Sequence, residues 1–339
     1  MDIQNLLREL CLAPGVGGQA AAAETAARLL SAYTKEITVS PLGNVVGRIR
    51  CGLENPPVVM LEAHIDQIGF VVTGVEDGFL RVEACGGIDP RTLAAADVVV
   101  FGDKPYPGVF TSTPPHLAGK DKGVPPVGDR LIDVGMDSET AKAHIPVGSR
   151  VSFSPRLQEV GEHGLSGTSL DDRAGVAAVL WAVDKLSQEE LAADVAVCFS
   201  AQEELGTRGA GSAAFAIRPH LAVAVDVSFA HTPDADRREC GVLGHGPMIG
   251  ISPGLDDRLS RRMEELAAEQ GIPYQREVMG GKTGTDADVI GTAAGGVRTA
   301  LLSIPQRYMH TPAELVDVRD VENTGRLMAA FVREGGRGI

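Results

Sequence analysis

The sequence predicts an α/β fold that is interrupted by a β-rich insertion. Short Val- and Ala-rich runs alternate with helical periods in residues 1–69 and 164–339, as strands and helices do in an α/β sheet. Residues 70–163 instead contain short alternating stretches separated by Gly and Pro, with no long helical period. A chain of 339 residues is long enough for two domains, or for one large domain with an insertion.

The first segment predicts two helices and then strands. Leucines at 6, 7 and 10 share one helical face, and a second helical stretch, "AAAETAARLLSAYTK", follows the break "PGVGGQ". Residues 36–50 and 56–70 are β-like. The run from Val58 to Leu61 is wholly apolar, which is typical of a strand buried on both faces.

The insertion is predicted from four stretches with strand character, "FVVTGV", "FLRVEACG", "DVVVFG" and "SRVSFSP". From residue 164 the strand–helix alternation returns. Helices are predicted near 171–187, 257–271 and 317–336, and Val/Ala-rich strands near 194–202, 220–228 and 297–305. We therefore expect an α/β domain made of 1–69 and 164–339, with a parallel-rich sheet, and an inserted β domain at 70–163.

Composition narrows the class of protein. A net charge of −14 argues against a nucleic-acid partner and against attachment to an anionic membrane. The five cysteines are scattered and form no CxxC pair, so we expect free thiols rather than disulfides or a zinc–thiolate site. The sequence has neither a signal-peptide pattern at residues 1–10 nor an apolar run of the roughly 18 residues that a membrane span needs. These features predict a soluble, cytoplasmic protein.

Polar side chains gather where the predicted strands end or helices begin. In open α/β sheets, ligands bind beyond the carboxyl ends of the strands. The residues are His64, Asp66, Asp171, Asp172, Glu203, Glu204, Asp226 and His310. Each has an ordinary explanation alone, such as a helix N-cap or a buried histidine. Together, imidazole and carboxylate without thiolate make a ligand set for Zn, Co or Mn.

Two such ions roughly 3.5–4 Å apart would share one bridging carboxylate. Asp66 lies two residues from His64, on the same side of a strand, and can hold the imidazole tautomer. Glu203 and Glu204 diverge at a strand end, so one can bind metal while the other acts as general base. The residues alone leave open which glutamate does which.

Six segments in this order resemble the M42 family of cobalt- or zinc-dependent aminopeptidases. They are "EAHIDQIGF", "SLDDRAGVAAVL", "SAQEELGTRGA", "AVAVDVSFA", "GGKTGTDADV" and "RYMHTPAELVDVRDVEN", within a resemblance that runs from about residue 5 to 332. Six ordered motifs are specific, whereas H-x-D or E-E alone is not. One departure is Gln67, where the family usually has an acid; we interpret it as a neutral exchange outside the ligand set.

The resemblance implies two divalent ions per subunit, Zn or Co with Mn as a further option. One would be bound by His64, Asp171 and Asp226, and the other by Asp171, Glu204 and His310. Glu203 would be the general base, Asp66 would orient His64, and Thr285 and Asp286 would contact the substrate. Related di-metal peptidases also imply a cis peptide between Asp171 and Asp172.

The implied fold is a phosphorylase/hydrolase-like di-metal peptidase domain with an inserted small β-barrel-like domain. That insertion would drive dimerisation on the way to a dodecamer. The implied activity is removal of N-terminal residues from short peptides by a metal-activated water. Alternatives are an M20-type carboxypeptidase or amidase and a non-catalytic scaffold. A glycosidase is disfavoured, because adjacent diverging glutamates do not flank a sugar bond.

Overall fold

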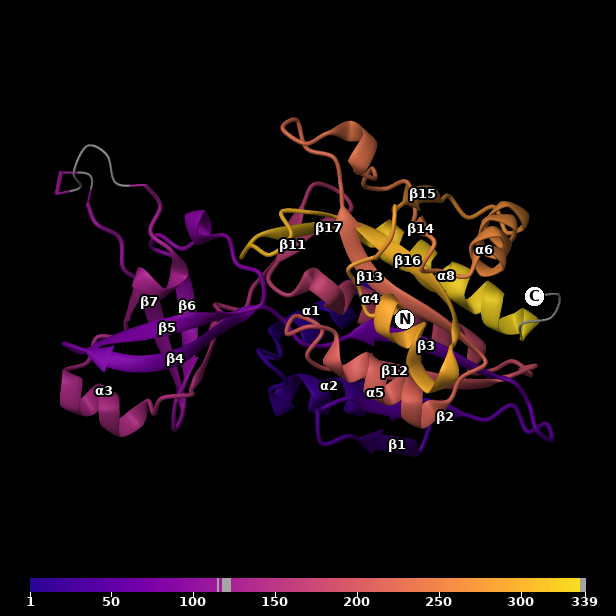
Figure 1. Ribbon diagram of the computed structural model, residues 1–339, viewed down its shortest axis with the longest axis horizontal. Coiled ribbons are helices and arrows are strands. Elements are labelled where there is room, and N and C mark those ends of the chain that lie inside the picture. The colour runs from indigo at the N-terminus through magenta and orange to yellow at the C-terminus, as the bar shows by residue number, and fades with distance from the viewer. Residues whose placement is uncertain (115, 118–122, 336–339) are drawn as a thin grey trace.

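A mixed sheet of eleven strands runs through the larger part of the molecule (Figure 1). The computed structural model describes residues 1–114, 116–117 and 123–335. Four strands at the centre of the sheet are parallel: β12 (Asp194–Ser200), β3 (Val58–His64), β13 (Leu221–Phe229) and β16 (Arg298–Arg307). Their carboxyl ends therefore meet at one edge of the sheet.

The flanking strands are antiparallel, which the expectation of a parallel-rich sheet did not include. On one side, β2 (Val45–Ile49) pairs with β12, and β1 (Glu36–Val39) forms a hairpin with β2. On the other side, β17 (Glu314–Asp317), β11 (Gly164–Gly167) and β10 (Leu157–Val160) continue from β16. β14 (Met248–Ile251) pairs antiparallel with β16 and parallel with β15 (Gln275–Val278).

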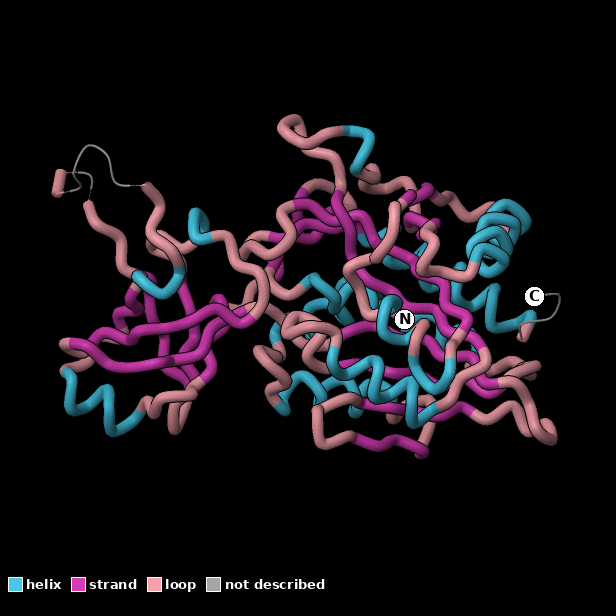
Figure 2. Tube along the Cα trace, in the orientation of Figure 1, coloured by secondary structure: helices cyan, strands magenta, loops and turns pink. Residues whose placement is uncertain are grey.

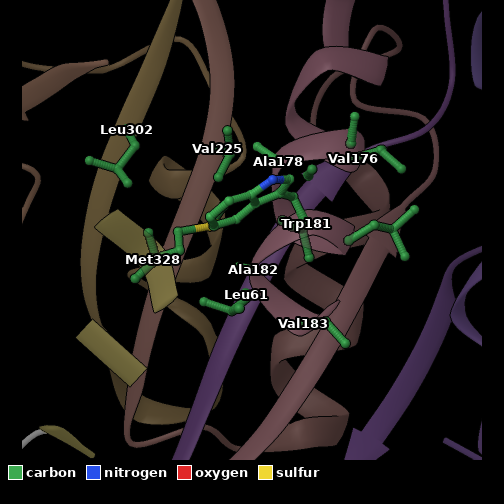
Figure 3. Close-up of a cluster of buried hydrophobic side chains, with 14 of the residues drawn as sticks. Leu61, Val176, Ala178, Trp181, Ala182, Val183, Val225, Leu302 and Met328 are labelled. Atoms are coloured by element: carbon green, nitrogen blue, oxygen red, sulfur yellow. The ribbon is translucent and has the colours of Figure 1, made fainter. Parts of the chain in front are cut away.

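Helices cover both faces of this sheet because alternate residues of its strands are apolar on both sides. Leu61, Val225 and Leu302 face the core that contains Trp181 and Met328 (Figure 3). The helices on this face are α1 (Ile3–Leu12), α2 (Ala20–Leu30), α4 (Leu170–Leu186), α6 (Asp257–Glu269) and α8 (Val318–Glu334). A smaller core packs the opposite face against α5 (Arg208–Ile217) and α7 (Ala287–Ile290).

The inserted segment forms a closed barrel of strands beside the α/β domain, and long loops connect several of these strands (Figure 2). The strand order is β4-β5-β8-β7-β6-β9. Their bounds are β4 (Gly69–Glu76), β5 (Phe79–Cys85), β6 (Asp97–Phe101), β7 (Pro105–Phe110), β8 (Leu131–Asp133) and β9 (Arg150–Phe153); α3 (Ser138–His144) lies at one end.

The barrel has a core of its own, in which Phe70 contacts Phe110 and Phe153 at ring-centroid distances of 4.9 and 5.5 Å. The first and last strands pair with each other through Phe70 and Val151, so the chain enters and leaves the barrel at neighbouring points. Residues 157–160, which we expected in the insertion, form β10 of the large sheet instead. Alternation predicts a strand but cannot tell which sheet it joins.

Within the described residues, no helix combines the length and the apolar character needed to cross a bilayer.

Candidate metal centre and active site

The candidate site lies at the carboxyl edge of the parallel strands, as the sequence predicted. His64 ends β3, Asp226 lies near the end of β13, and the Glu203–Glu204 doublet follows β12. His310 follows β16, and Asp171 is the second residue of α4. Five elements far apart in the sequence thus bring their side chains to one place.

The first group of side chains surrounds His64. Its Nε2 atom lies 3.0 Å from Asp171 Oδ1 and 3.8 Å from Asp226 Oδ1. All three residues are buried, and their ligand atoms lie within 4.8 Å of one another. One cation could therefore contact all three.

The second group shares Asp171 with the first. His310 Nε2 lies 3.3 Å from Asp171 Oδ2 and 3.4 Å from Glu204 Oε1. These three ligand atoms also lie within 4.8 Å of one another. Because the two carboxylate oxygens of Asp171 face different histidines, this residue can bridge two cations.

Burial dominates the electrostatics of the site. It raises the pKa of Asp226 well above its usual range, and the nearby Asp172 and Asp171 carboxylates raise it further. Burial also raises the pKa of Glu203 to about 7. Burial acts on Asp171 in the same direction, but hydrogen bonds from His310 and His64 outweigh it and lower the pKa of that residue. Hydrogen bonds to Asp171 and Glu204 raise the pKa of His310 to about 11.

These residues fit a pair of divalent cations. Among the described residues, no Lys or Arg forms a salt bridge with the acids of the two groups, whose ion-pair partners are His64 and His310. Like-charged buried carboxylates are stabilised by a bound cation. Two imidazoles and three carboxylates are also the donor types that zinc, cobalt and manganese accept.

Asp66 supports the site in two ways, only one of which the sequence suggested. Its Oδ1 atom lies 3.6 Å from His64 Nδ1, the ring nitrogen that faces away from Asp171. Asp66 also accepts hydrogen bonds from the backbone N–H groups of Glu203, at 2.9 Å, and Glu204, at 3.3 Å. It therefore holds the backbone of the doublet beside the histidine.

Glu314 and Asp172 are buried acids beside the bridging residue. The Glu314 carboxylate accepts the backbone N–H groups of Leu170, at 2.7 Å, and Asp171, at 3.2 Å, and the peptide bond between Asp171 and Asp172 is cis, as expected. Asp172 accepts the backbone N–H of Gly175 at 2.9 Å. Sequence reasoning missed Glu314, because one acid in a strand pattern predicts only a polar strand position.

Two glycines after β5 bring the barrel segment against two candidate ligands, His310 and Glu204. A Cβ atom on Gly87 would lie 2.9 Å from His310 Nδ1, and one on Gly86 would lie 3.0 Å from Glu204 Oε2. Gly86 also has a φ of +87°, which favours glycine. The pair "GG" indicated only a turn, so its contact with the site could not be predicted.

A cavity of about 280 Å³ opens beside the two groups of ligands. Glu203 and Thr285 are among the residues that line it. Asp286 does not line it. Its carboxylate is buried behind the wall, with Oδ2 2.6 Å from Ser200 Oγ, and the same hydroxyl lies 2.7 Å from Glu62. We expected Asp286 to contact the substrate, but its carboxylate is not among the groups that line the cavity.

Gln67 is buried away from the ligand atoms. Its Oε1 atom accepts the backbone N–H of Gly15 at 3.1 Å, and a β-bridge joins it to Val16. The fully buried Arg173 passes close to the same loop, since a Cβ on Gly15 would lie 2.3 Å from its Nη2 atom. Gln67 thus holds the N-terminal loop in place through these contacts with Gly15 and Val16.

Known proteins are similar to this chain in both sequence and fold. A family profile described as M42 glutamyl aminopeptidase matches residues 43–327. A lysyl aminopeptidase from Pyrococcus furiosus is 37% identical over 338 residues, which cover 97% of this chain and 96% of that protein. The structure of an aminopeptidase from the archaeon Desulfurococcus kamchatkensis matches with a TM-score of 0.91 and 34% identity, over 98% of this chain and 94% of that one.

The TET1 peptidase from Pyrococcus horikoshii matches with a TM-score of 0.86 and 30% identity, over 98% of this chain and all of that one. It is described as assembling into a tetrahedron or a large octahedral shell. These matches favour an aminopeptidase over the M20-type carboxypeptidase, and they extend over both the sheet and the barrel. The chain is a member of the M42 family of aminopeptidases, and it is a hydrolase.

Proposed function

We propose that the chain is a di-metal aminopeptidase that releases N-terminal residues from short peptides, with Glu203 as its general base. The observation that carries this proposal is the pair of ligand groups sharing Asp171, with the Glu203 carboxylate on the wall of the same cavity. His64, Asp171 and Asp226 would hold one ion, and Asp171, Glu204 and His310 the other. Two bound divalent ions would polarise the scissile carbonyl and make water a better nucleophile at neutral pH.

The protein's own groups would move the proton. Glu203 takes a proton from the attacking water, and it later delivers that proton to the leaving amine. Two features support this role. Glu203 lines the cavity without belonging to either ligand group, and burial raises its pKa to about 7. Asp66 would position both His64 and the doublet, and Thr285 would contact the substrate.

The proposal is tested with a panel of aminoacyl-p-nitroanilides. The purified protein is treated with a chelator, dialysed, and assayed before and after addition of Zn²⁺, Co²⁺ or Mn²⁺, with metal content measured by elemental analysis. We expect activity to disappear on chelation and to return with about two ions per subunit. N-acyl amino acids serve as the comparison substrates, since hydrolysis of these alone would contradict an aminopeptidase.

We also propose that the barrel, residues 69–153, mediates dimerisation, and that dimers build a dodecamer in the cytoplasm. Support comes from the TET1 relative, which assembles into shells, and from exposed apolar side chains on the barrel segment, including Val109 and Val147. Light scattering coupled to gel filtration measures the mass in solution. A monomer at micromolar concentration would contradict the assembly.

A further inference from the structure

The family alone leaves open which N-terminal residue the enzyme prefers. The description of the matching profile names a glutamyl aminopeptidase, whereas the Pyrococcus furiosus relative is a lysyl aminopeptidase. Glutamyl and lysyl side chains carry opposite charges. The answer must therefore come from this chain's own cavity, beyond the ligand groups and the Glu203–Glu204 doublet.

One further carboxylate lines that cavity. Glu277 lies on β15, and both of its oxygens accept hydrogen bonds from serine hydroxyls: Ser303 Oγ donates to Oε2 at 2.6 Å, and Ser228 Oγ donates to Oε1. Ser303 is buried and lies on β16, whereas Ser228 lies on β13. The register partner of Glu277 on the intervening strand β14 is Gly250, which places no side chain in its way. Two donors on two strands therefore hold the carboxylate in one position.

This carboxylate has no cationic partner among the described residues. No salt bridge there includes Glu277, and its neighbour Arg276 is paired with Glu264 outside the cavity. Lys282, in the loop before Thr283, is exposed and forms no ion pair with it. Each carboxylate oxygen can accept a further hydrogen bond beyond the one from serine. A cation entering the cavity would supply that donor and the missing countercharge.

The position of Glu277 suits the end of a long side chain. Ser228 lies two residues beyond the candidate ligand Asp226 on β13, which is about 7 Å along the strand. A lysyl side chain is a charged group on a flexible four-carbon stem that can span such a separation. The walls between are partly apolar, with Val227, Leu301 and Met309, and apolar walls are favourable for a methylene stem whose charged end finds a polar partner.

We propose that Glu277 is the specificity-determining residue of this enzyme, and that it selects peptides with a basic N-terminal residue, lysine or arginine. The proposal rests on the aminopeptidase function above. Glu277 would contact the substrate's ammonium or guanidinium group, remote from the scissile bond. Ser228 and Ser303 would act as positioning residues, because they hold the carboxylate.

The test compares substrates that differ only in charge. Lysyl- and norleucyl-p-nitroanilide have the same stem length, and arginyl and glutamyl substrates complete the set. For the wild-type enzyme, kcat/KM for lysyl over norleucyl is expected to be about 10- to 100-fold, the value of one hydrogen-bonded charge pair. Glu277→Gln keeps the shape and an acceptor oxygen but removes the charge, so this ratio should fall to within a few-fold of one.

A control variant removes the same charge elsewhere. Glu159 is exposed on the edge strand β10. The variant Glu159→Gln should leave the lysyl-to-norleucyl ratio of kcat/KM unchanged. A wild-type ratio near one, or a ratio that Glu277→Gln does not alter, would overturn the inference. So would a preference for glutamyl substrates, which would point to Lys282 instead. Failure to cleave any of the four substrates, with metal restored, would instead reject the proposed function itself.

Discussion

Glu203 and Glu204 are neighbours in the chain, but their carboxylates have different surroundings. The Glu204 side chain is 5% exposed and its Oε1 atom lies 3.4 Å from His310, within a ligand group. Glu203 lines the cavity and belongs to neither ligand group. Their backbone N–H groups are both bound by Asp66, so the two side chains cannot exchange positions without breaking that support.

This difference predicts the result of a single substitution. Glu203→Gln removes the proposed proton acceptor but no candidate metal ligand, so kcat should fall by about 10²- to 10⁴-fold, the usual contribution of general acid–base catalysis. Metal content, measured by elemental analysis, should stay at the wild-type value. Wild-type turnover in a correctly folded variant would show that Glu203 is not the base.

The bridging position of Asp171 predicts a different outcome. Asp171→Ala takes one ligand from each group, so the variant should lose most of both ions after dialysis. Asp226→Ala is the matched comparison, because it takes a ligand from one group only and should retain about one ion per subunit. Equal metal content in the two variants would contradict the bridging role.

At the scale of elements, the loop after β5 is the place where the barrel segment meets the ligands. Gly86 and Gly87 lie so close to Glu204 and His310 that no side chain fits between them without a shift. The loop thus forms one wall of the second ligand group, although it is separated from His310 by more than 220 residues of sequence.

Gly87→Ala should therefore lower activity by about 10- to 100-fold, because a shift of a ligand by about 1 Å is enough for such a loss. The added methyl group would lie 2.9 Å from His310 Nδ1 and must displace the ring. Gly74→Ala is the control within the barrel, where an added Cβ meets nothing within 4 Å. If both variants retain the same kcat/KM, the loop does not set the position of His310.

At the scale of the whole molecule, the buried carboxylates of the site lower the stability of the folded protein when no metal is bound. Burial raises the pKa values of Asp226, Glu203 and Glu204, which shows that their charged forms are disfavoured where they lie. A cation that binds the folded chain and not the unfolded one stabilises it, by about 2.7 kcal/mol at 100 times its Kd.

Chelation should therefore lower the melting temperature as well as abolish activity, and Zn²⁺ or Co²⁺ should restore both. Differential scanning calorimetry before and after chelation measures the change. Asp171→Ala serves as the control, because its melting temperature should respond much less to added metal. A melting temperature that is the same with and without metal would contradict this coupling.

Much of the fold could be predicted from local pattern. Apolar runs such as Val58–Leu61 are typical of buried strands, and the helical period of α8 was clear. The site could be predicted because polar groups at strand ends meet at one edge of a parallel sheet. The direction of each strand in the sheet was harder to predict. β2 and β17 pair antiparallel with their neighbours, and β10 joins the large sheet, because pairing partners are chosen by contacts distant in sequence.

The sequence by itself determined the types of side chain at the site, their order along the chain and the resemblance that implies separate roles for Glu203 and Glu204. Only the tertiary structure decided which groups touch. It placed Asp286 behind the wall with Glu62 and Ser200, gave Asp66 a second task at the doublet, and brought Glu277 into the cavity. The reason is physical: spacing along a strand determines which way a side chain points, but its partner comes from another strand, whose distance no local pattern encodes.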